Sequence, residues 1–172
     1  MEAKAGIKFK GIWEIKIWDK DRLVSKSTAE NLITNEGLNH DLNVIFHGVA
    51  QIGTWYCILS ETDTAPDAGM TYAVPVFTET IAYNEATRPE YVEAGSTAKE
   101  ITNAANQAVF TASATKTFYG AALVGGGTSP TVKGDTAGGG TLQSYGKFAT
   151  AQPVIAGNKV DLTYTITAAD AG

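Results

Sequence analysis

The segment KVDLTYTIT, residues 159–167, has the clearest alternation of apolar and polar side chains in this sequence. Lysine, aspartate and threonine alternate there with four apolar residues, Val160, Leu162, Tyr164 and Ile166. This is the period of a strand with one packed face and one wet face. Similar short segments precede it at intervals of roughly ten residues, a spacing typical of all-β domains: EYVEA, KEITNA, QAVFTAS, TKTFYGAALV and LQSYGKFA. The pattern predicts a mainly β fold, an antiparallel β-sandwich or jelly-roll-like domain.

The N-terminal segment, residues 7–33, predicts a β-hairpin. Apolar and charged residues alternate between Ile7 and Trp18, the polar segment DKDR follows, and residues 23–33 form a second strand. Ile12 and Trp18 are apolar residues on the otherwise polar face. A tryptophan in such a place either covers a second layer or lies in a protein interface, and both alternatives stay open.

One segment, TNEGLNHDLNVIFHG at residues 34–48, predicts a helix over 35–47. Thr34 or Asn35 can cap its start, Glu36 suits the positive end of the helix dipole, and Gly48 suits a left-handed end. Five apolar residues fall on one stripe by the i, i+4, i+7 rule: Leu38, Leu42, Ile45, Phe46 and Val49. We expect this stripe to pack on the sheet and the polar residues to be caps, dipole partners or a solvated face.

The remaining chain extends the same picture to a single domain over residues 1–172, with sandwich strands between 54 and 167. TWYCIL, residues 54–59, predicts a core strand in which Trp55 and Tyr56 pack. Residues 71–90 predict an irregular excursion with one helical turn in TETIAYNEA, because prolines interrupt regular structure. The glycine runs at 125–130 and 138–140 predict a low-order projecting loop used for contact.

Composition excludes several classes of protein. The chain has 172 residues, enough for one domain with a single core, and a net charge of −5 with dispersed basic residues, which argues against nucleic-acid binding. The lone Cys57 has no disulfide partner and is expected to be a buried thiol. No segment has the apolar length of a signal-peptide core or a membrane span, so we expect the protein to be made and used in a cytoplasm, or built into something assembled there.

No motif predicts a catalytic centre, a metal site or a cofactor. The glycine runs lack the lysine and helix of a phosphate-binding loop. His40 and His47, two turns apart on the predicted helix, lack enough converging ligands for a metal and are too few for a nucleophilic triad. The acidic residues Glu61, Asp63 and Asp67 leave a loose surface calcium site open. A pair of carboxylates acting on a glycosidic bond also stays open, since such pairs meet in space.

Three segments, ENLITNEGLNHDLNVIFHG, TWYCIL and DLTYTITAAD, together resemble a family of small structural proteins of tailed bacteriophages. In that family a hairpin beginning W-x-[VI] leads into N-L-[VI]-T-N-x-G-L-N, a T-W-Y strand follows, and the chain closes on T-Y-T-[IL]-T. The likeness covers the first sixty residues and the last dozen, with NEATRPEYVEA as a weaker bridge and Asp41 as a departure. The matching residues are Asn31, Leu32, Thr34, Asn35, Gly37, Leu38, Asn39, Trp55 and Tyr56.

The resemblance implies a non-enzymatic virion protein, foremost a capsid decoration or cement protein. It implies binding to the major capsid protein on the outer head lattice as a homo-oligomer, with a trimer favoured over a dimer, after assembly in the host cytoplasm. A tail or fibre-base component is the alternative, and a carbohydrate-binding module is a hypothesis of another class. The residues expected to contact partners are Ile12, Trp18, Gly126 and Gly139.

Overall fold

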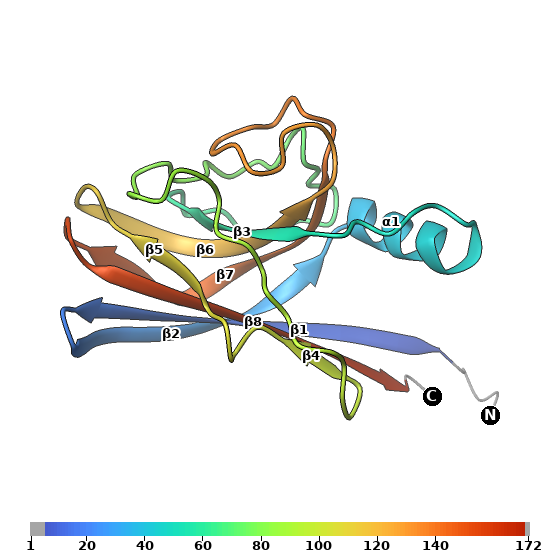
Figure 1. Cartoon of the computed structure of the whole chain (residues 1–172), viewed down its shortest axis with the longest axis horizontal. Helices are drawn as coiled ribbons and strands as arrows, with labels where there is room; N and C mark the ends of the chain where they lie inside the picture. Colours follow the sequence, from blue (N-terminus) through green and yellow to red (C-terminus); the bar gives the residue numbers. More distant parts are fainter. Residues whose placement is uncertain (1–5, 171–172) are drawn as a thin grey trace.

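The structure, a computed structural model, describes residues 6–170, which form eight strands and one helix (Figure 1). The elements in chain order are β1 (Ile7–Asp19), β2 (Arg22–Ile33), α1 (Asn35–Phe46), β3 (Trp55–Ser60), β4 (Glu100–Thr102), β5 (Ala108–Thr111), β6 (Lys116–Gly125), β7 (Thr141–Val154) and β8 (Lys159–Asp170). The predicted mainly β fold with one short helix is confirmed, as are the N-terminal hairpin and the left-handed Gly48, with φ of 70°.

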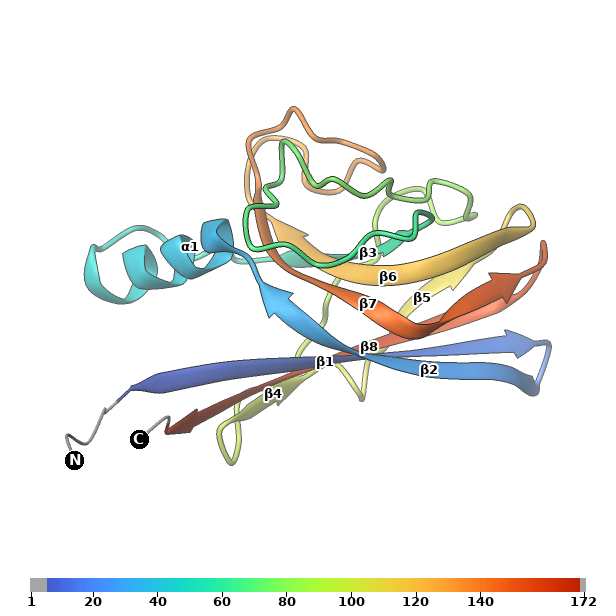
Figure 2. The same ribbon diagram turned by 180° about the vertical axis from the view of Figure 1, so that it is seen from behind.

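The strands make one antiparallel sheet in the order β3-β6-β7-β2-β1-β8-β4, and β5 also pairs with β8. β2 joins the two halves because it changes partner: it pairs with β1 up to Glu30, and with β7 from Asn31 to Ile33. The sheet curls at this crossover, so that the β3-β6-β7 half covers the β2-β1-β8 half (Figures 1 and 2). The core lies between the two halves.

The long excursion between β3 and β4 connects the edges of the curled sheet. Tyr91 N donates to Trp55 O and Cys57 N donates to Pro89 O, both at 2.8 Å, which adds residues 89–91 to the edge of β3. Asn84 N donates to Thr111 O on β5. The helical turn predicted in TETIAYNEA is wrong, because residues 78–86 supply backbone hydrogen bonds to these strands instead.

The inner face of the sheet carries the larger apolar cluster. The rings of Trp13 and Tyr164 stack with centroids 4.0 Å apart, and both side chains are fully buried. Ile7 and Phe9 lie on the same face of β1, but they are 76% and 38% exposed because β1 extends past the core. Cys57 is buried there, as predicted, and burial raises the pKa of its thiol.

One expectation about the outer face of the sheet is corrected, and one feature of that face is new. Thr163 of β8 was expected on a wet face but is buried, since Gln107 Nε2 donates to its hydroxyl at 2.7 Å. Tyr72 and Phe77 belong to a second apolar cluster, in which the excursion covers the outer side of β3, β6 and β7. Half-buried Trp55 packs on the inner cluster and Tyr56 on this outer one.

The glycine-rich segment 126–140 is held in place, contrary to the low-order loop predicted. Arg88 Nη1 donates to Pro130 O at 3.1 Å, and Nη2 donates to Asp135 O at 2.8 Å. Tyr72 Oη donates to the Asp135 carboxylate at 2.8 Å, which lowers the pKa of that carboxyl. Within the segment, Thr128 N donates to Gly138 O. Glycine here permits tight turns, and the fixed conformation comes from Arg88 and Tyr72.

Candidate interaction surface

The end of the molecule that carries α1 extends beyond the curled sheet as two separate arms (Figures 1 and 2). One arm is α1. The other, which we call the ribbon, consists of the start of β1, the end of β8 and β4, with Ile7 opposite Asp170 and Ile101 opposite Ile166. In the described part of the chain, β2 does not accompany the ribbon, because its register with β1 begins only at Ile12.

Asn31 lies at the point where β2 separates from β1, shortly before α1 begins. Its side-chain carbonyl accepts from Gly11 N at 2.7 Å, and its amide donates to Tyr164 Oη at 2.6 Å. Ser144 of β7 also donates to that phenol oxygen. The first residue of the family-like motif therefore links β1, β2, β7 and β8 at the point where the sheet divides.

The first turn of α1 is fixed to β7 by the next residues of the motif. Thr34 is the N-cap: its hydroxyl accepts from Gly37 N at 3.0 Å and donates to Leu142 O. Glu36 accepts from Leu142 N at 2.6 Å and from Tyr72 N at 2.8 Å, so it does more than complement the helix dipole. Gly37 is buried against the backbone of β7.

The apolar stripe of α1 does not pack on the sheet, and this expectation is wrong. Five residues of the stripe are exposed: Leu38 (42%), Leu42 (56%), Ile45 (60%), Phe46 (79%) and Val49 (44%). Of the residues in α1, Gly37 is the buried one. Because the contacts of the first turn set the direction of the helix, the later turns extend past the sheet with their apolar side uncovered.

A groove of about 400 Å³ lies between α1 and the ribbon. Phe9, Ile101 and Ile166 of the ribbon line one side, while Val44 and Ile45 line the helix side. Its floor contains Trp55, Tyr91, Leu123 and Tyr164. The groove is therefore largely apolar on both sides, and Ile45 belongs both to its wall and to the exposed stripe.

Two polar residues that α1 contributes to the groove contact other residues of its lining. His40 meets the edge of Trp55, with ring centroids 5.7 Å apart. Asp41 accepts from Gln143 Nε2 at 2.9 Å, and burial raises the pKa of this aspartate despite that hydrogen bond. Asp41, the departure from the family pattern, thus fixes the inner side of α1 to β7.

We expect Asp41→Asn to stabilise the protein slightly at neutral pH. Folding raises the pKa of Asp41, so the contribution of this group to stability falls as the pH rises through its folded pKa. Asparagine keeps an acceptor for Gln143 without the charge, and the gain should stay below about 1 kcal/mol because water still screens the half-exposed group.

Urea unfolding at pH 7 and at roughly pH 3, below the usual pKa of aspartate, measures this effect. The gain should disappear at the acidic pH. The control is Asp21→Asn, in the exposed β1–β2 turn. If the gain in stability from Asp41→Asn persists at the acidic pH, or if Asp21→Asn gives the same gain, then desolvation of the Asp41 carboxylate is not its cause.

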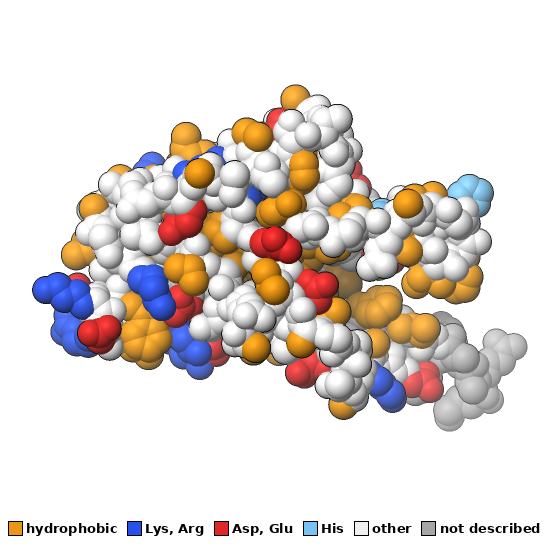
Figure 3. All heavy atoms as spheres, viewed as in Figure 1, with side chains coloured by type: hydrophobic (Ala, Val, Ile, Leu, Met, Phe, Trp, Pro, Cys, Tyr) orange, Lys and Arg blue, Asp and Glu red, His pale blue; other side chains and the backbone are white. Residues whose placement is uncertain are grey.

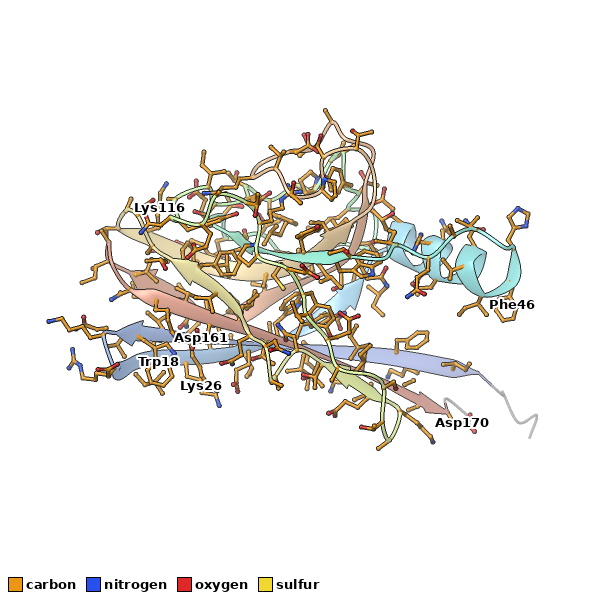
Figure 4. The ribbon with its side chains drawn as sticks, in the orientation of Figure 1. Trp18, Lys26, Phe46, Lys116, Asp161 and Asp170 are labelled. Carbon is orange, nitrogen blue, oxygen red and sulfur yellow. The ribbon has the colours of Figure 1, made fainter. Side chains whose placement is uncertain are left out.

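The residues expected to contact partners do not gather on this surface. Ile12 is 42% exposed on β1, and Trp18 lies half-buried at the opposite end of the molecule from α1, beside Asp161 in Figure 4. Lys159 Nζ stands 5.9 Å from the centre of the Trp18 ring. Gly126 packs against Ile52, and Gly139 is exposed in the glycine-rich segment. The four residues therefore lie in two places, Ile12 and Trp18 on β1, and Gly126 and Gly139 in the glycine-rich segment.

The acidic residues considered for calcium have separate partners. Glu61 pairs with Lys116 at 3.0 Å, Asp63 pairs with Lys147, and Asp67 accepts from Gly69 N. Over residues 6–170, no group of three or more His, Cys, Asp or Glu side chains could hold a metal ion. Neither does any helix in that range have the length and apolar content to cross a membrane.

Sequence reasoning missed the exposed stripe and the buried pair formed by Arg88 and Glu79. Arg88 is one of two arginines in the chain, and this rarity was the available signal. Its partner lies nine residues earlier in an irregular segment, where no periodic pattern predicts contact.

No known protein family matches this chain, and no curated protein matches it either.

Proposed function

We propose that this chain is a non-enzymatic structural protein of a tailed-bacteriophage virion, acting through its surfaces. The observation that carries the proposal is the uncovered apolar face formed by α1 and the ribbon. Large exposed apolar patches mark sites of protein association. The resemblance of the motif around Asn31–Asn39 supports the choice of a virion, and the structure assigns these residues to building that face.

Within the virion we propose a capsid decoration or cement protein on the outside of the head. Its partners would be the major capsid protein and further copies of itself, with assembly in the host cytoplasm. At many symmetric positions on a shell, modest contacts stabilise the whole by avidity. The net charge of −5 suits a protein whose partners are proteins rather than nucleic acid.

A tail or fibre-base component is the second candidate, because the same β-rich architecture and apolar end would serve assembly there. Copy number in purified virions separates the two. A number comparable with that of the shell protein supports decoration, whereas a number comparable with that of tail proteins contradicts it.

Labelling by an antibody in electron microscopy tests the location directly. We expect label over the heads, and heads that lack this protein should rupture at a lower temperature than complete heads. Label confined to tails would exclude the decoration role, and absence from the virion would exclude both. A carbohydrate-binding module instead predicts binding on a glycan array by the isolated protein.

A further inference from the structure

The apolar surface at the end with α1 is large enough to form an interface. Seven large apolar side chains there are 38–79% exposed: Ile7, Phe9, Leu38, Leu42, Ile45, Phe46 and Val49. At roughly 150–200 Å² for a fully exposed residue of this size, they expose about 600–800 Å² together. The largest apolar patch of a typical monomer is roughly 300–600 Å², and one partner in a stable complex buries about 800 Å².

The surface has a protruding part and a hollow part side by side. Figure 3 shows apolar side chains along the side of α1 that faces the ribbon and on the ribbon itself. Phe46 projects from the last turn of α1 (Figure 4). The groove between the arms is the hollow part, and Ile45 makes the two continuous.

The open backbone edge of β1 is a weaker site for docking. Lys8 and Lys10 lie on this edge strand, and Lys10 Nζ contacts the Glu30 carboxylate at 2.6 Å. Charged side chains on an edge strand hinder strand pairing between molecules. At this end of the molecule, the apolar stripe and the groove are therefore the parts best suited to bind a partner.

We propose that this surface binds a second copy of the chain, with the stripe of each α1 packed against the other and Phe46 entering the partner's groove. The protrusion and the groove are both apolar, so the protrusion of one copy can fill the groove of a second copy. The area matches what each partner gives to a stable dimer.

The contact is a two-fold one. In an isologous interface one patch meets itself, whereas a closed ring joins two different patches of each protomer. Here the protrusion and the hollow adjoin in a single patch at one end of the molecule. This placement favours a dimer over the trimer that the family resemblance implies. The inference of a dimer does not depend on the proposed role in a virion.

Sedimentation of the purified protein tests the proposal. We expect a concentration-dependent species of twice the 18.1 kDa chain mass. Phe46→Glu should weaken dimerisation by at least about 30-fold, the effect of losing a central aromatic contact. Because Phe46 is 79% exposed in the single chain, the variant should keep the circular dichroism spectrum of the parent protein and, at concentrations where both are monomeric, its unfolding curve.

The matched control is Ile155→Glu, which places the same charge at a 57% exposed apolar residue in the β7–β8 turn, at the opposite end of the molecule. It should leave the dimer intact. A chain that stays monomeric at all concentrations, or a dimer that Phe46→Glu leaves unchanged, overturns the proposal. Loss of attachment to heads by Phe46→Glu in a monomeric protein would assign the surface to the shell instead and also overturn it.

Cross-linking tests the two-fold arrangement. The natural thiol, Cys57, is fully buried, so an introduced surface cysteine is the accessible one. Leu42→Cys, Ile45→Cys and Phe46→Cys are made separately, and at least one should give a disulfide-linked dimer on oxidation, because residues near a two-fold axis meet their own copies. Ile155→Cys should give none. Failure at all three positions, or equal yield from the control, contradicts the arrangement.

Discussion

Replacement of Arg88 by methionine is expected to lower the free energy of unfolding by about 3–5 kcal/mol, the cost of leaving a buried charge without its partner. Arg88 is 2% exposed and the Glu79 side chain is 7% exposed. The guanidinium holds both carboxylate oxygens, with Nε 2.9 Å from Oε1. Methionine fills similar space but leaves the buried Glu79 carboxylate without its cation.

The loss should reach the glycine-rich segment as well. Arg88 also donates to Tyr72, Pro130 and Asp135, while its own backbone N–H donates to Thr131 O. We therefore expect faster hydrogen exchange over residues 126–140 in the variant, even under conditions where the curled sheet stays folded. Segments such as β8 should keep their protection under those conditions.

The pH dependence of the variant identifies the cause. Burial raises the pKa of Glu79 although Arg88 opposes the shift, so removal of the guanidinium should raise this pKa further. A group with a raised folded pKa costs more stability as the pH rises through that pKa. Arg88→Met should accordingly recover stability relative to the parent protein when the pH falls from 7 to about 5.

Two further variants serve as controls, both measured by urea unfolding. Arg22→Met removes the other arginine, which is 77% exposed in its pair with Asp19, and should change the stability by less than about 1 kcal/mol. Glu79→Leu combined with Arg88→Met removes both charges and should restore part of the loss. A loss for Arg88→Met no larger than that for Arg22→Met would contradict a buried pair.

The sequence predicted the strands well where a local period carries the information. Ile15 and Ile17 alternate with charged residues and are fully buried, and β8 begins at Lys159, where its alternation begins. The closure of the sheet was not predictable in this way. Tyr91 and Asn84 pair with distant strands through backbone groups, which leave no pattern of side chains in the sequence.

The helix shows a different limit of sequence reasoning. Its period of apolar residues correctly predicts a helix over nearly the observed range, but periodicity gives no information on what covers the apolar side. An amphipathic helix usually packs its apolar side inward and exposes its polar side, but α1 does the reverse. Thr34 and Glu36 bind β7, while Leu42 and Phe46 remain exposed. The dense polar residues of this motif suggest a reactive site, but in the structure they fix a helix whose apolar side is uncovered.

Gly37 is the position where this arrangement is most sensitive, and Gly37→Ala is expected to destabilise the protein by about 2–3 kcal/mol, within the range for overpacking. A Cβ atom would lie 2.5 Å from Gln143 O and 2.9 Å from Gln143 Cα, both backbone atoms of β7. α1 would have to move outward, which stretches the contacts of Glu36 and Thr34 with β7.

The sign of this effect distinguishes close packing from helix propensity. Alanine favours an ordinary helix by about 1 kcal/mol over glycine, so a stabilised variant would mean that α1 has no close contact with β7. The control is Gly95→Ala, where a Cβ meets nothing within 4 Å and which should be neutral or gain up to about 1 kcal/mol. Urea unfolding followed by tryptophan fluorescence measures both variants. Because the first turn sets the direction of the arm, Gly37→Ala should also weaken dimerisation, whereas Phe46→Glu should weaken dimerisation and leave the stability of the monomer unchanged.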